Sequence, residues 1–290
     1  MYIEEININN FRNIERENII PSKGINLILG KNAQGKTNFL EAIYVIANIK
    51  SFRGKKLSET INNKNEKSTI KTRINKNKVN NEIYLEIEKD KKNILLNNKK
   101  TNKISEYLGL LDTVLFYPDD IICVKGSPIL RRSLLDRSIF HTDNNYLSLF
   151  KEYLRCLKQR NAALKEKNSD IWDSQFVELA TKVTFSRLNY IFRINSILDE
   201  TYEQIYHCGE KVEIKYPHCD SDLLTFKKKF ADRLTAVKKK EQLYGLTLIG
   251  PHRDDPLFLL NKQLLSLYGS QGQQRSFMLA FKTAQIIDFK

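Results

Sequence analysis

The first third of the chain alternates apolar and polar residues in short segments. Residues 3–8 form one such segment, residues 25–29 form a second that ends at Gly30, and residues 83–88 form a third. Alternation is typical of strands that pack one face on a core. The third segment therefore predicts a half-exposed antiparallel strand, and the second predicts a strand leading directly to Gly30.

Shorter signals complete this strand pattern. Asn97 and Asn98 lie between a leucine pair and a lysine pair, which predicts a hairpin turn. The stretch 62–81 is rich in Asn and Lys with little periodicity, so we expect a loop with at most one weak strand. Near the end of the chain, residues 257–260 predict a hairpin strand that returns to the sheet.

Other apolar residues recur at helical spacing. This pattern predicts helices over residues 37–47, 146–157, 172–198 and 277–289. The middle of the chain, 119–240, carries the long amphipathic stripes without sustained heptads. It predicts an inserted helical lobe rather than a coiled coil.

The composition fits a chain that buries a core, with 41% hydrophobic and 28% charged residues among 290. No stretch of apolar residues is long enough for a membrane-spanning helix, and the amino terminus lacks the features of a secretory signal. The four cysteines are scattered and form no CxxC pair. We therefore expect a reduced, cytoplasmic compartment and no membrane partner.

Positive charge is concentrated in two blocks. The formal net charge is +14, and residues 61–105 and 226–290 each carry 12 basic against 5 acidic residues, whereas 169–225 carries 5 against 10. Such a distribution favours a polyanionic partner such as DNA. A lysine-rich composition arising from A/T-rich codons explains the total charge equally well.

The motif GKNAQGKT provides the strongest chemical signal. It matches GxxxxGK[ST], with a predicted strand before it and an amphipathic helix after it. In such a loop, backbone N–H groups surround phosphates, the lysine reaches the β- and γ-phosphates and the hydroxyl binds Mg²⁺. The sequence therefore predicts binding of ATP or GTP. The predicted nucleotide-binding residues are Gly30, Lys31, Asn32, Ala33, Gln34, Gly35, Lys36 and Thr37, with Thr37 also the Mg²⁺ ligand.

Several further motifs, in a fixed order, together resemble the RecF family of bacterial recombination mediators. They are Asn10 to Asn13, GKNAQGKTNFLEAIY, FYPDDIICVKGSPILRRSLLD from Phe116, QRNAALK from Gln159, GPHRDD from Gly250 and SQGQQR from Ser270. The resemblance covers essentially the whole chain. It implies an α/β fold of the P-loop ABC/SMC-type ATPase head, with a two-part mixed sheet and the inserted helical lobe. The head would comprise 1–118 and 241–290, and the lobe 119–240.

The resemblance also implies a composite nucleotide site. SQGQQR resembles the signature motif of SMC and ABC heads, which implies an ATP-dependent homodimer with ATP between the phosphate loop of one copy and the signature of the other. The residues implied there are Ser270, Gln271, Gly272 and Gln273. A hydroxyl and a backbone N–H at a helix start can bind a γ-phosphate that ADP lacks. Without the resemblance, SQGQQR is a polar turn before a helix.

Arg12 and Asn13 fall where related heads contact the base or ribose, so the resemblance implies a nucleotide contact for both. The alternative is a strand-end turn that uses asparagine for a left-handed conformation. At the level of function, the resemblance implies recognition of gapped or single-strand/double-strand junction DNA and help with recombinase loading. It also implies RecO- and RecR-like partners, roles in replication restart and SOS induction, and weak DNA-dependent ATPase activity.

Heads of this class carry a Walker B strand after the signature helix, ending in carboxylates that bind Mg²⁺ and polarise water. Residues 114–120 and 286–288 only imitate that pattern: a proline interrupts the first, and the second continues helical spacing. We therefore expect a fragment or a truncated product that hydrolyses ATP poorly by itself.

Several motifs keep more than one interpretation. GPHRDD could be catalytic or, more simply, a salt-bridged turn. Arg131 and Arg132 could contact DNA or pair with Asp136, and the lysine triplets 227–229 and 238–240 are candidates for phosphate contacts. The His-Cys pairs at 207–208 and 218–219 suggest zinc, but adjacent strand residues point to opposite faces.

Rival functions are a P-loop kinase or GTPase acting on a small substrate, a structural SMC-like protein, and a nuclease built on an ABC head. The first leaves SQGQQR unexplained. The second requires long heptad arms, for which the helical segment is too short. The third requires a metal-carboxylate domain that residues up to Lys290 do not show.

Overall fold

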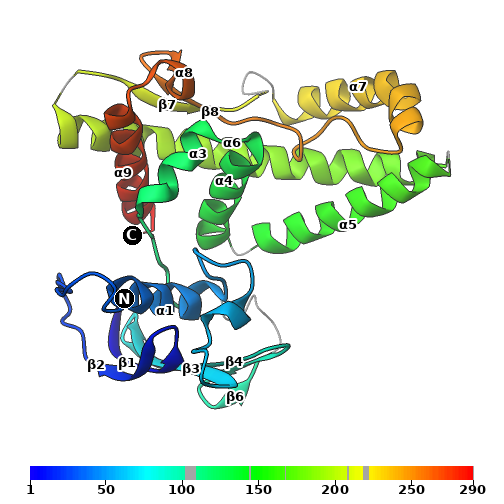
Figure 1. The fold of residues 1–290 in the computed structure, drawn as a ribbon. Coiled ribbons are helices and arrows are strands. Elements are labelled where there is room, and N and C mark those ends of the chain that lie inside the picture. Colours follow the sequence, from blue (N-terminus) through cyan, green and yellow to red (C-terminus); the bar gives the residue numbers. More distant parts are fainter. Residues whose placement is uncertain (102–108, 144, 167, 208, 218–221, 290) are drawn as a thin grey trace. The chain divides into compact units, whose positions relative to one another are not determined.

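The computed structural model describes residues 1–101, 109–143, 145–166, 168–207, 209–217 and 222–289. Its contacts divide the chain into two compact units, Met1–Leu115 and Phe116–Lys290 (Figure 1). Cys208, His218 and Cys219, which belong to the predicted His-Cys pairs, lie outside the described residues.

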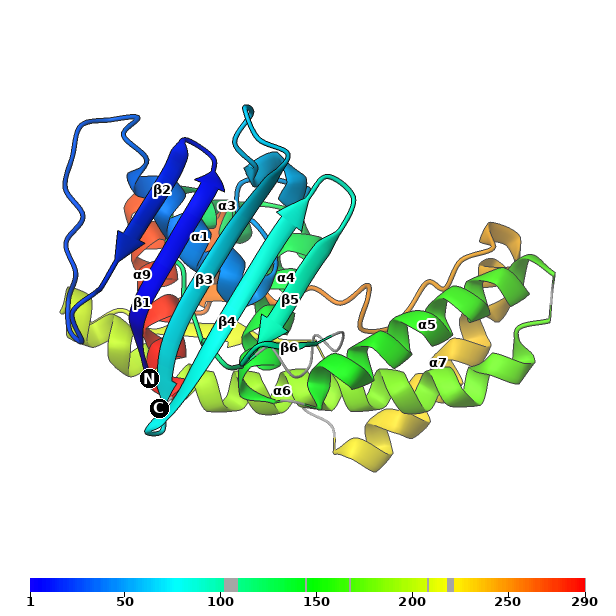
Figure 2. The same ribbon diagram turned by 90° about the horizontal axis from the view of Figure 1, so that it is seen from below.

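The first unit is built on a six-stranded antiparallel sheet in the order β2-β1-β3-β4-β5-β6 (Figure 2). Alternating side chains of β1, β3 and β4 are buried on one face, as period-2 patterning requires. The predicted strands at 3–8 and 83–88 are confirmed. The strands are β1 (Tyr2–Phe11), β2 (Ile14–Ile19), β3 (Lys67–Lys76), β4 (Val79–Glu88), β5 (Lys92–Leu96) and β6 (Lys99–Lys100).

The loop predicted over 62–81 is wrong for most of its length, because β3 runs through it. Small polar residues conceal the alternation of this strand. Ser68 and Thr72 share the buried face with Ile70 and Ile74, and their hydroxyls donate to the carbonyl oxygens of β1 residues Asn9 (3.1 Å) and Glu5 (2.9 Å). Satisfied hydroxyls can be buried at little cost, so this strand is internal despite its polar sequence.

The turn at Asn97 and Asn98 is confirmed. Both residues have positive φ, 49° and 63°, between β5 and β6. Asparagine tolerates this left-handed conformation better than most residues.

One helix, α1 (Lys36–Asn48), packs its apolar stripe on the sheet, and the prediction over 37–47 is confirmed (Figure 2). Ala42, Val45 and Ile46 are fully buried against isoleucines of β1 and β3. A short 3₁₀ turn, η1 (Leu57–Thr60), follows the helix. This core fixes the position of α1, and the glycine-rich loop leads directly into the first residues of that helix.

The strand predicted over 25–29 is not formed. Ile25, Leu27 and Leu29 are 97%, 78% and 79% exposed in an extended segment without ladder bonds. Alternation produces a strand only where a neighbouring strand accepts its backbone groups, and none lies beside this segment among the described residues. Hydrogen bonds between Ser22 and Asn26 close a local turn that includes the start of this segment.

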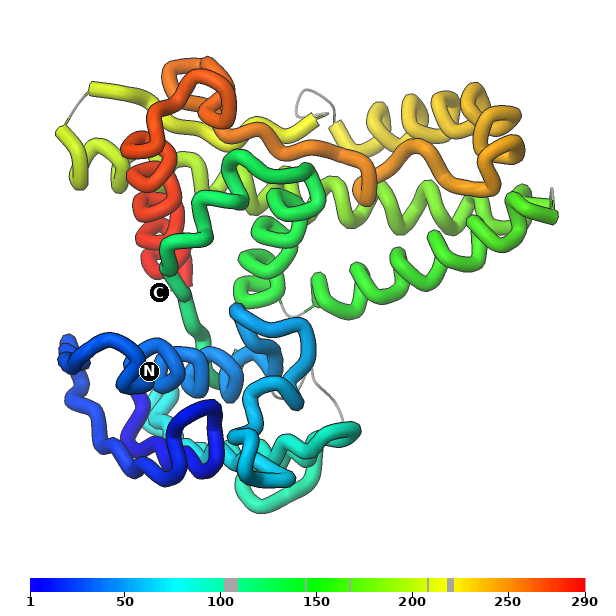
Figure 3. Tube along the Cα trace, viewed as in Figure 1, coloured from blue at the N-terminus to red at the C-terminus, as the bar shows by residue number. Residues whose placement is uncertain are grey.

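The second unit is mainly helical. Its long helices α5, α6 and α7 lie side by side (Figure 3), and the helices predicted over 146–157, 172–198 and 277–289 are confirmed. The elements are η2 (Pro118–Ile121), α3 (Ile122–Lys125), α4 (Pro128–Thr142), α5 (Tyr146–Lys165), α6 (Asp170–Tyr206), α7 (Leu223–Tyr244), α8 (Leu265–Tyr268) and α9 (Gln271–Asp288).

A three-stranded antiparallel sheet accompanies these helices, in the order β7-β8-β9. The predicted hairpin strand at 257–260 is confirmed as β8 (Leu257–Leu260), paired with β9 (Gln263–Leu264) and β7 (Val212–Lys215). Its predicted return to the sheet of the first unit is wrong, because β8 belongs to this separate sheet. Side chains of α6 cap the outer edge of β7. Asn195 exchanges two hydrogen bonds with Ile214, and Asp199 accepts from the N–H of Val212.

Two buried arginines hold the second unit together. Arg187 on α6 makes a bidentate ion pair with Asp136 on α4, at 2.8 and 2.9 Å, and donates to the Pro251 carbonyl at 2.7 Å. Arg160, in the QRNAALK motif on α5, is fully buried and donates to Glu241 at 2.7 Å and to Asp173 at 2.8 Å. The QRNAALK motif and the motif from Phe116 to Asp136 therefore each supply one residue to a buried ion pair.

Among the described residues, no helix is long and apolar enough to cross a bilayer.

By its contacts, the segment 241–290 belongs to the second unit, together with the long helices. That residues 1–118 and 241–290 act together as one ATPase head stays a prediction.

We expect Arg187→Ala to lower the free energy of unfolding by about 3–5 kcal/mol, because it leaves the buried Asp136 carboxylate without its counter-charge. Urea unfolding followed by far-UV circular dichroism measures this loss. Arg155→Ala, which removes an exposed arginine from α5, is the matched control and should change the value by less than about 0.5 kcal/mol. Equal values for the two variants would refute a supporting role of the buried pair.

Candidate nucleotide site

The glycine-rich loop precedes α1 and has the backbone that phosphate binding requires. Gly35 has a φ of 95°, in the left-handed region that glycine adopts without strain. A Cβ at this position would lie 2.8 Å from Oδ1 of Asn13. Glycine is therefore required here both for its conformation and for the close approach of Asn13.

Lys36 lies over the same loop. Its ammonium group donates to the carbonyl oxygens of Gly30 at 2.6 Å and Lys31 at 2.8 Å. No side chain caps the start of α1, where Gly35 is the N-cap residue, so the first-turn N–H groups can bind an anion. Thr37, the second residue of the helix, is exposed. These groups fit the phosphates of a nucleotide, and Thr37 as the Mg²⁺ ligand stays a prediction.

Arg12 and Asn13 lie beside this loop, at the turn between β1 and β2. Arg12 has a φ of 55°. The Asn13 amide donates to the Ala33 carbonyl at 3.2 Å and accepts from the Asn38 amide at 2.7 Å. The structure thus brings Asn13 into the phosphate loop itself.

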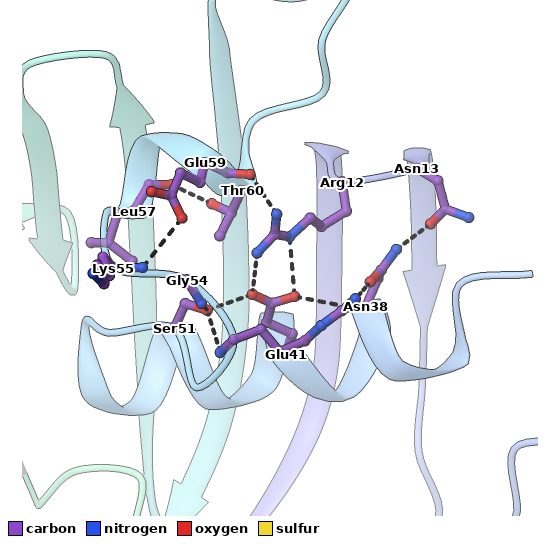
Figure 4. Close-up of polar contacts among 11 residues, drawn as sticks. Arg12, Asn13, Asn38, Glu41, Ser51, Gly54, Lys55, Leu57, Glu59 and Thr60 are labelled. Atoms are coloured by element: carbon purple, nitrogen blue, oxygen red, sulfur yellow. Dashed lines mark hydrogen bonds and ion pairs between the residues drawn. The ribbon is translucent and has the colours of Figure 1, made fainter. Parts of the chain in front are cut away.

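The Arg12 guanidinium is bound to a buried carboxylate. It donates to both oxygens of Glu41, at 2.7 and 3.1 Å, and to the Glu59 carbonyl at 2.6 Å (Figure 4). Glu41 is fully buried on α1, and it also accepts from the Ser51 hydroxyl at 2.6 Å. The contact of Arg12 with base or ribose stays a prediction.

Sequence reasoning missed Asn38 and Glu41 on α1 and Arg53, which follows this helix. Asn38 accepts from Arg53 at 2.6 Å, and Arg53 also approaches Glu41 at 3.5 Å (Figure 4). One signal was available: Glu41 stands four residues before Val45, on the buried stripe of the helix. A carboxylate at such a position needs a buried partner.

The signature residues begin α9 in the second unit. Ser270 is the N-cap: its hydroxyl oxygen accepts from the Gln273 N–H at 3.2 Å, and the Gln273 side chain accepts from the Ser270 N–H at 2.9 Å. This is a capping box. The serine oxygen acts as an acceptor, so its own proton remains available to an incoming oxygen. Gln271 and Gly272 form the exposed first turn.

Glu210 also contacts the signature. It accepts from the Gln273 amide at 2.7 Å and from the Tyr202 hydroxyl of α6 at 2.9 Å. The first turn of α9 is therefore connected to the long helix. Because Ser270–Gln273 and the phosphate loop belong to different units, each set is described by itself, and the composite site stays a prediction.

The GPHRDD motif forms a turn before β8, and its groups are engaged in internal contacts. Arg131 pairs with Asp255 at 2.7 and 2.9 Å, and Arg132 donates to the Asp254 carbonyl at 2.6 Å. The salt-bridged turn is confirmed. The pairing of these arginines with Asp136 is wrong, because Asp136 is bound to Arg187.

His252 in this turn lies between Tyr153, whose hydroxyl is 2.6 Å from Nδ1, and the Thr247 carbonyl, 3.1 Å from Nε2. Burial lowers the pKa of His252 to about 4, because it penalises the charged imidazolium. The ring is therefore neutral at pH 7 and acts as a structural link.

The structure also bears on the lysine triplets, on metal binding and on residues 286–288. Within the lysine triplets, Lys227 contacts Glu178, and Lys238 contacts Asp170 and Asp173. The described part of the chain holds no group of three or more His, Cys, Asp or Glu residues arranged to bind a metal. Asp288 lies on α9 and pairs with Arg193, at 2.6 and 3.1 Å, which agrees with its helical spacing.

We expect the second unit to lose stability as the pH falls from about 6.5 to about 4. The unfolded chain protonates His252 near its ordinary pKa of 6.5, whereas the folded chain resists protonation until about 4. Over this range the unfolded state binds more protons, so acidification favours it. Thermal unfolding at several pH values should show a smaller decline for His252→Asn than for the wild type. Parallel pH profiles would contradict the assignment.

Comparison with known proteins agrees with this geometry. The RecF/RecN/SMC N terminal domain family matches residues 2–288. The DNA replication and repair protein RecF of Syntrophotalea carbinolica is 38% identical over all of this chain and 81% of its own length. The protein of the same name from Geotalea uraniireducens is 40% identical over 99% of this chain and 80% of its own length.

Solved structures give the same result. A structure described as the recombination mediator protein RecF-ATP in the RecFOR pathway superposes with a TM-score of 0.91 at 31% identity, covering 99% of this chain and 81% of its own. The Smc head domain of Pyrococcus furiosus shares the fold, with a TM-score of 0.56 at 17% identity over 98% of this chain and 78% of its own. The fold is thus that of RecF and SMC ATPase heads, and the chain belongs to the RecF family of DNA replication and repair proteins.

Proposed function

We propose that this chain is an ATP-dependent DNA-binding recombination mediator. The observation that carries the proposal is the phosphate loop, in which Lys36, the uncapped start of α1 and the left-handed Gly35 converge on one anion site. The solved RecF-ATP structure of the RecFOR pathway superposes over nearly the whole chain, which supports ATP as the nucleotide. Mg²⁺ would bind the Thr37 hydroxyl.

ATP would act by joining two copies. The triphosphate on Gly30–Thr37 of one copy meets Ser270–Gln273 of the other, where the Ser270 hydroxyl proton and the first-turn N–H groups of α9 can bind the γ-phosphate. ADP lacks that group, so the dimer is favoured by ATP alone. Such a switch needs only a differential affinity for the two states.

DNA is the proposed polyanionic partner, and gapped or junction DNA the proposed form. The exposed lysines of the basic blocks would contact phosphates, whereas Lys227 and Lys238 are already engaged with carboxylates. RecO- and RecR-like proteins, recombinase loading, replication restart and SOS induction belong to the same proposal, with the cytoplasm as compartment. A small-molecule kinase or GTPase is less consistent, because the match to RecF extends through both units.

We expect Lys36→Ala to abolish ATP binding and with it ATP-dependent dimerisation, because it removes the cation that reaches the β- and γ-phosphates. Ser270→Arg should retain ATP binding and lose dimerisation, because it blocks the tip that meets the partner's phosphate. Sedimentation velocity with and without ATP, combined with nucleotide titration, separates the two effects. A dimer formed normally by Ser270→Arg would refute the composite site.

We expect DNA affinity to fall steeply with salt, by roughly 100-fold between 50 and 200 mM for four phosphate contacts. Replacing the exposed Lys239 and Lys240 by alanine should lower the slope of the salt dependence. Lys182→Ala, at a lysine paired with Glu178, is the control and should leave the slope unchanged. Affinity that does not respond to salt would show that the basic blocks do not contact phosphates.

A further inference from the structure

Hydrogen bonds connect the phosphate loop to a segment that follows α1. The Ala33 carbonyl accepts from Asn13, whose Oδ1 accepts from Asn38, whose Oδ1 in turn accepts from Arg53. The distances are 3.2, 2.7 and 2.6 Å. This path begins inside the nucleotide loop and ends on the segment Ser51–Glu59. Figure 4 shows its central residues, Asn13 and Asn38.

Asn38 occupies the centre of the path, and its carboxamide can satisfy both neighbours in only one orientation. Its NH₂ group must face the Asn13 oxygen, and its oxygen must face the Arg53 guanidinium. A displacement of Asn13 therefore reaches Arg53 through a single rigid group.

Arg53 depends on this contact for its position. Its side chain is 47% exposed, and its approach to Glu41 is long, at 3.5 Å, whereas the bond to Asn38 is 2.6 Å. Asn38 is therefore the closer of the two contacts that hold the guanidinium. An exposed arginine without such a contact samples many rotamers.

The rest of the segment is folded around buried polar groups. The Ser51 hydroxyl donates to Glu41 and accepts from the N–H groups of Arg53 and Gly54, both at 2.9 Å. At the far end, Arg12 donates to the Glu59 carbonyl. The backbone of the segment is thus tied to the same helix that carries the phosphate loop.

We propose that Asn38 is a positioning residue that couples the phosphate loop to the segment Ser51–Glu59, so that nucleotide binding orders this segment. The inference rests on the proposed ATP site. Phosphate binding fixes the loop around Ala33, Asn13 follows its carbonyl, and Asn38 then holds Arg53 in one rotamer. The segment carries Arg53, Lys55 and Lys56 on its exposed side, so the coupling places a cationic surface under the control of the nucleotide.

Hydrogen–deuterium exchange of the 290-residue chain, with and without saturating Mg²⁺-ATP, tests the proposal. In the wild type, ATP should slow exchange of the amides in 51–60 by about fivefold, the factor that corresponds to one hydrogen bond of ordinary net strength. ATP affinity is measured on the same samples by titration.

Asn38→Asp is the informative variant, because aspartate still accepts from Arg53 but has no N–H for Asn13. It should retain the wild-type exchange of 51–60 without nucleotide, bind ATP at saturation, and lose the ATP-dependent slowing. Asn48→Ala is the matched control. It removes another asparagine amide from the same helix, one that donates to the Tyr44 carbonyl and the Thr113 hydroxyl and lies outside the path, and it should keep the full response.

The outcomes are distinguishable. An Asn38→Asp response equal to that of the wild type, or ATP binding by the wild type without any change in 51–60, would overturn the coupling and leave the ATP site intact. A wild type that binds no ATP would overturn the proposed function and the coupling together.

Discussion

The architecture of the first unit depends on one buried carboxylate. Glu41 is fully buried, and an unpaired charge in that position would cost several kcal/mol. Its partners must therefore stay in place: Arg12 at the end of β1, Ser51 after α1, and Arg53 beyond it. The turn after β1 and the segment after α1 thus meet at one side chain of that helix, and the phosphate loop is part of the same arrangement through Asn13 and Asn38.

The second unit uses the same constraint with the charges reversed. Arg187 and Arg160 are the buried cations, and carboxylates from other helices surround them. Pairs of this kind contribute little net stability compared with apolar packing. Any arrangement that separates the partners, however, leaves a buried charge unpaired and is strongly destabilised. Two motifs of the family resemblance, GPHRDD and QRNAALK, are parts of these networks. Family motifs can thus report on folding as readily as on chemistry.

The sequence predicts the elements whose periodicity arises from large apolar side chains. β1, β4, α1, α5, α6 and α9 follow from their spacing, and the asparagine turn follows from its chemistry. β3 escapes prediction because serine and threonine occupy buried positions through hydrogen bonds to β1, which no local pattern reveals. Residues 25–29 show the reverse error, because a correct alternation has no neighbouring strand. In the site, the phosphate loop follows from its motif, whereas the partners of Glu41 depend on tertiary contacts.

The capped edge of β7 limits how copies of this protein can associate. An open strand edge invites another chain to extend the sheet, which leads to uncontrolled polymers. Asn195 and Asp199 on α6 already occupy the outward backbone groups of Val212 and Ile214. A strand of another copy therefore cannot pair with β7 at Val212 and Ile214. Any contact between copies at this edge must be made by side chains.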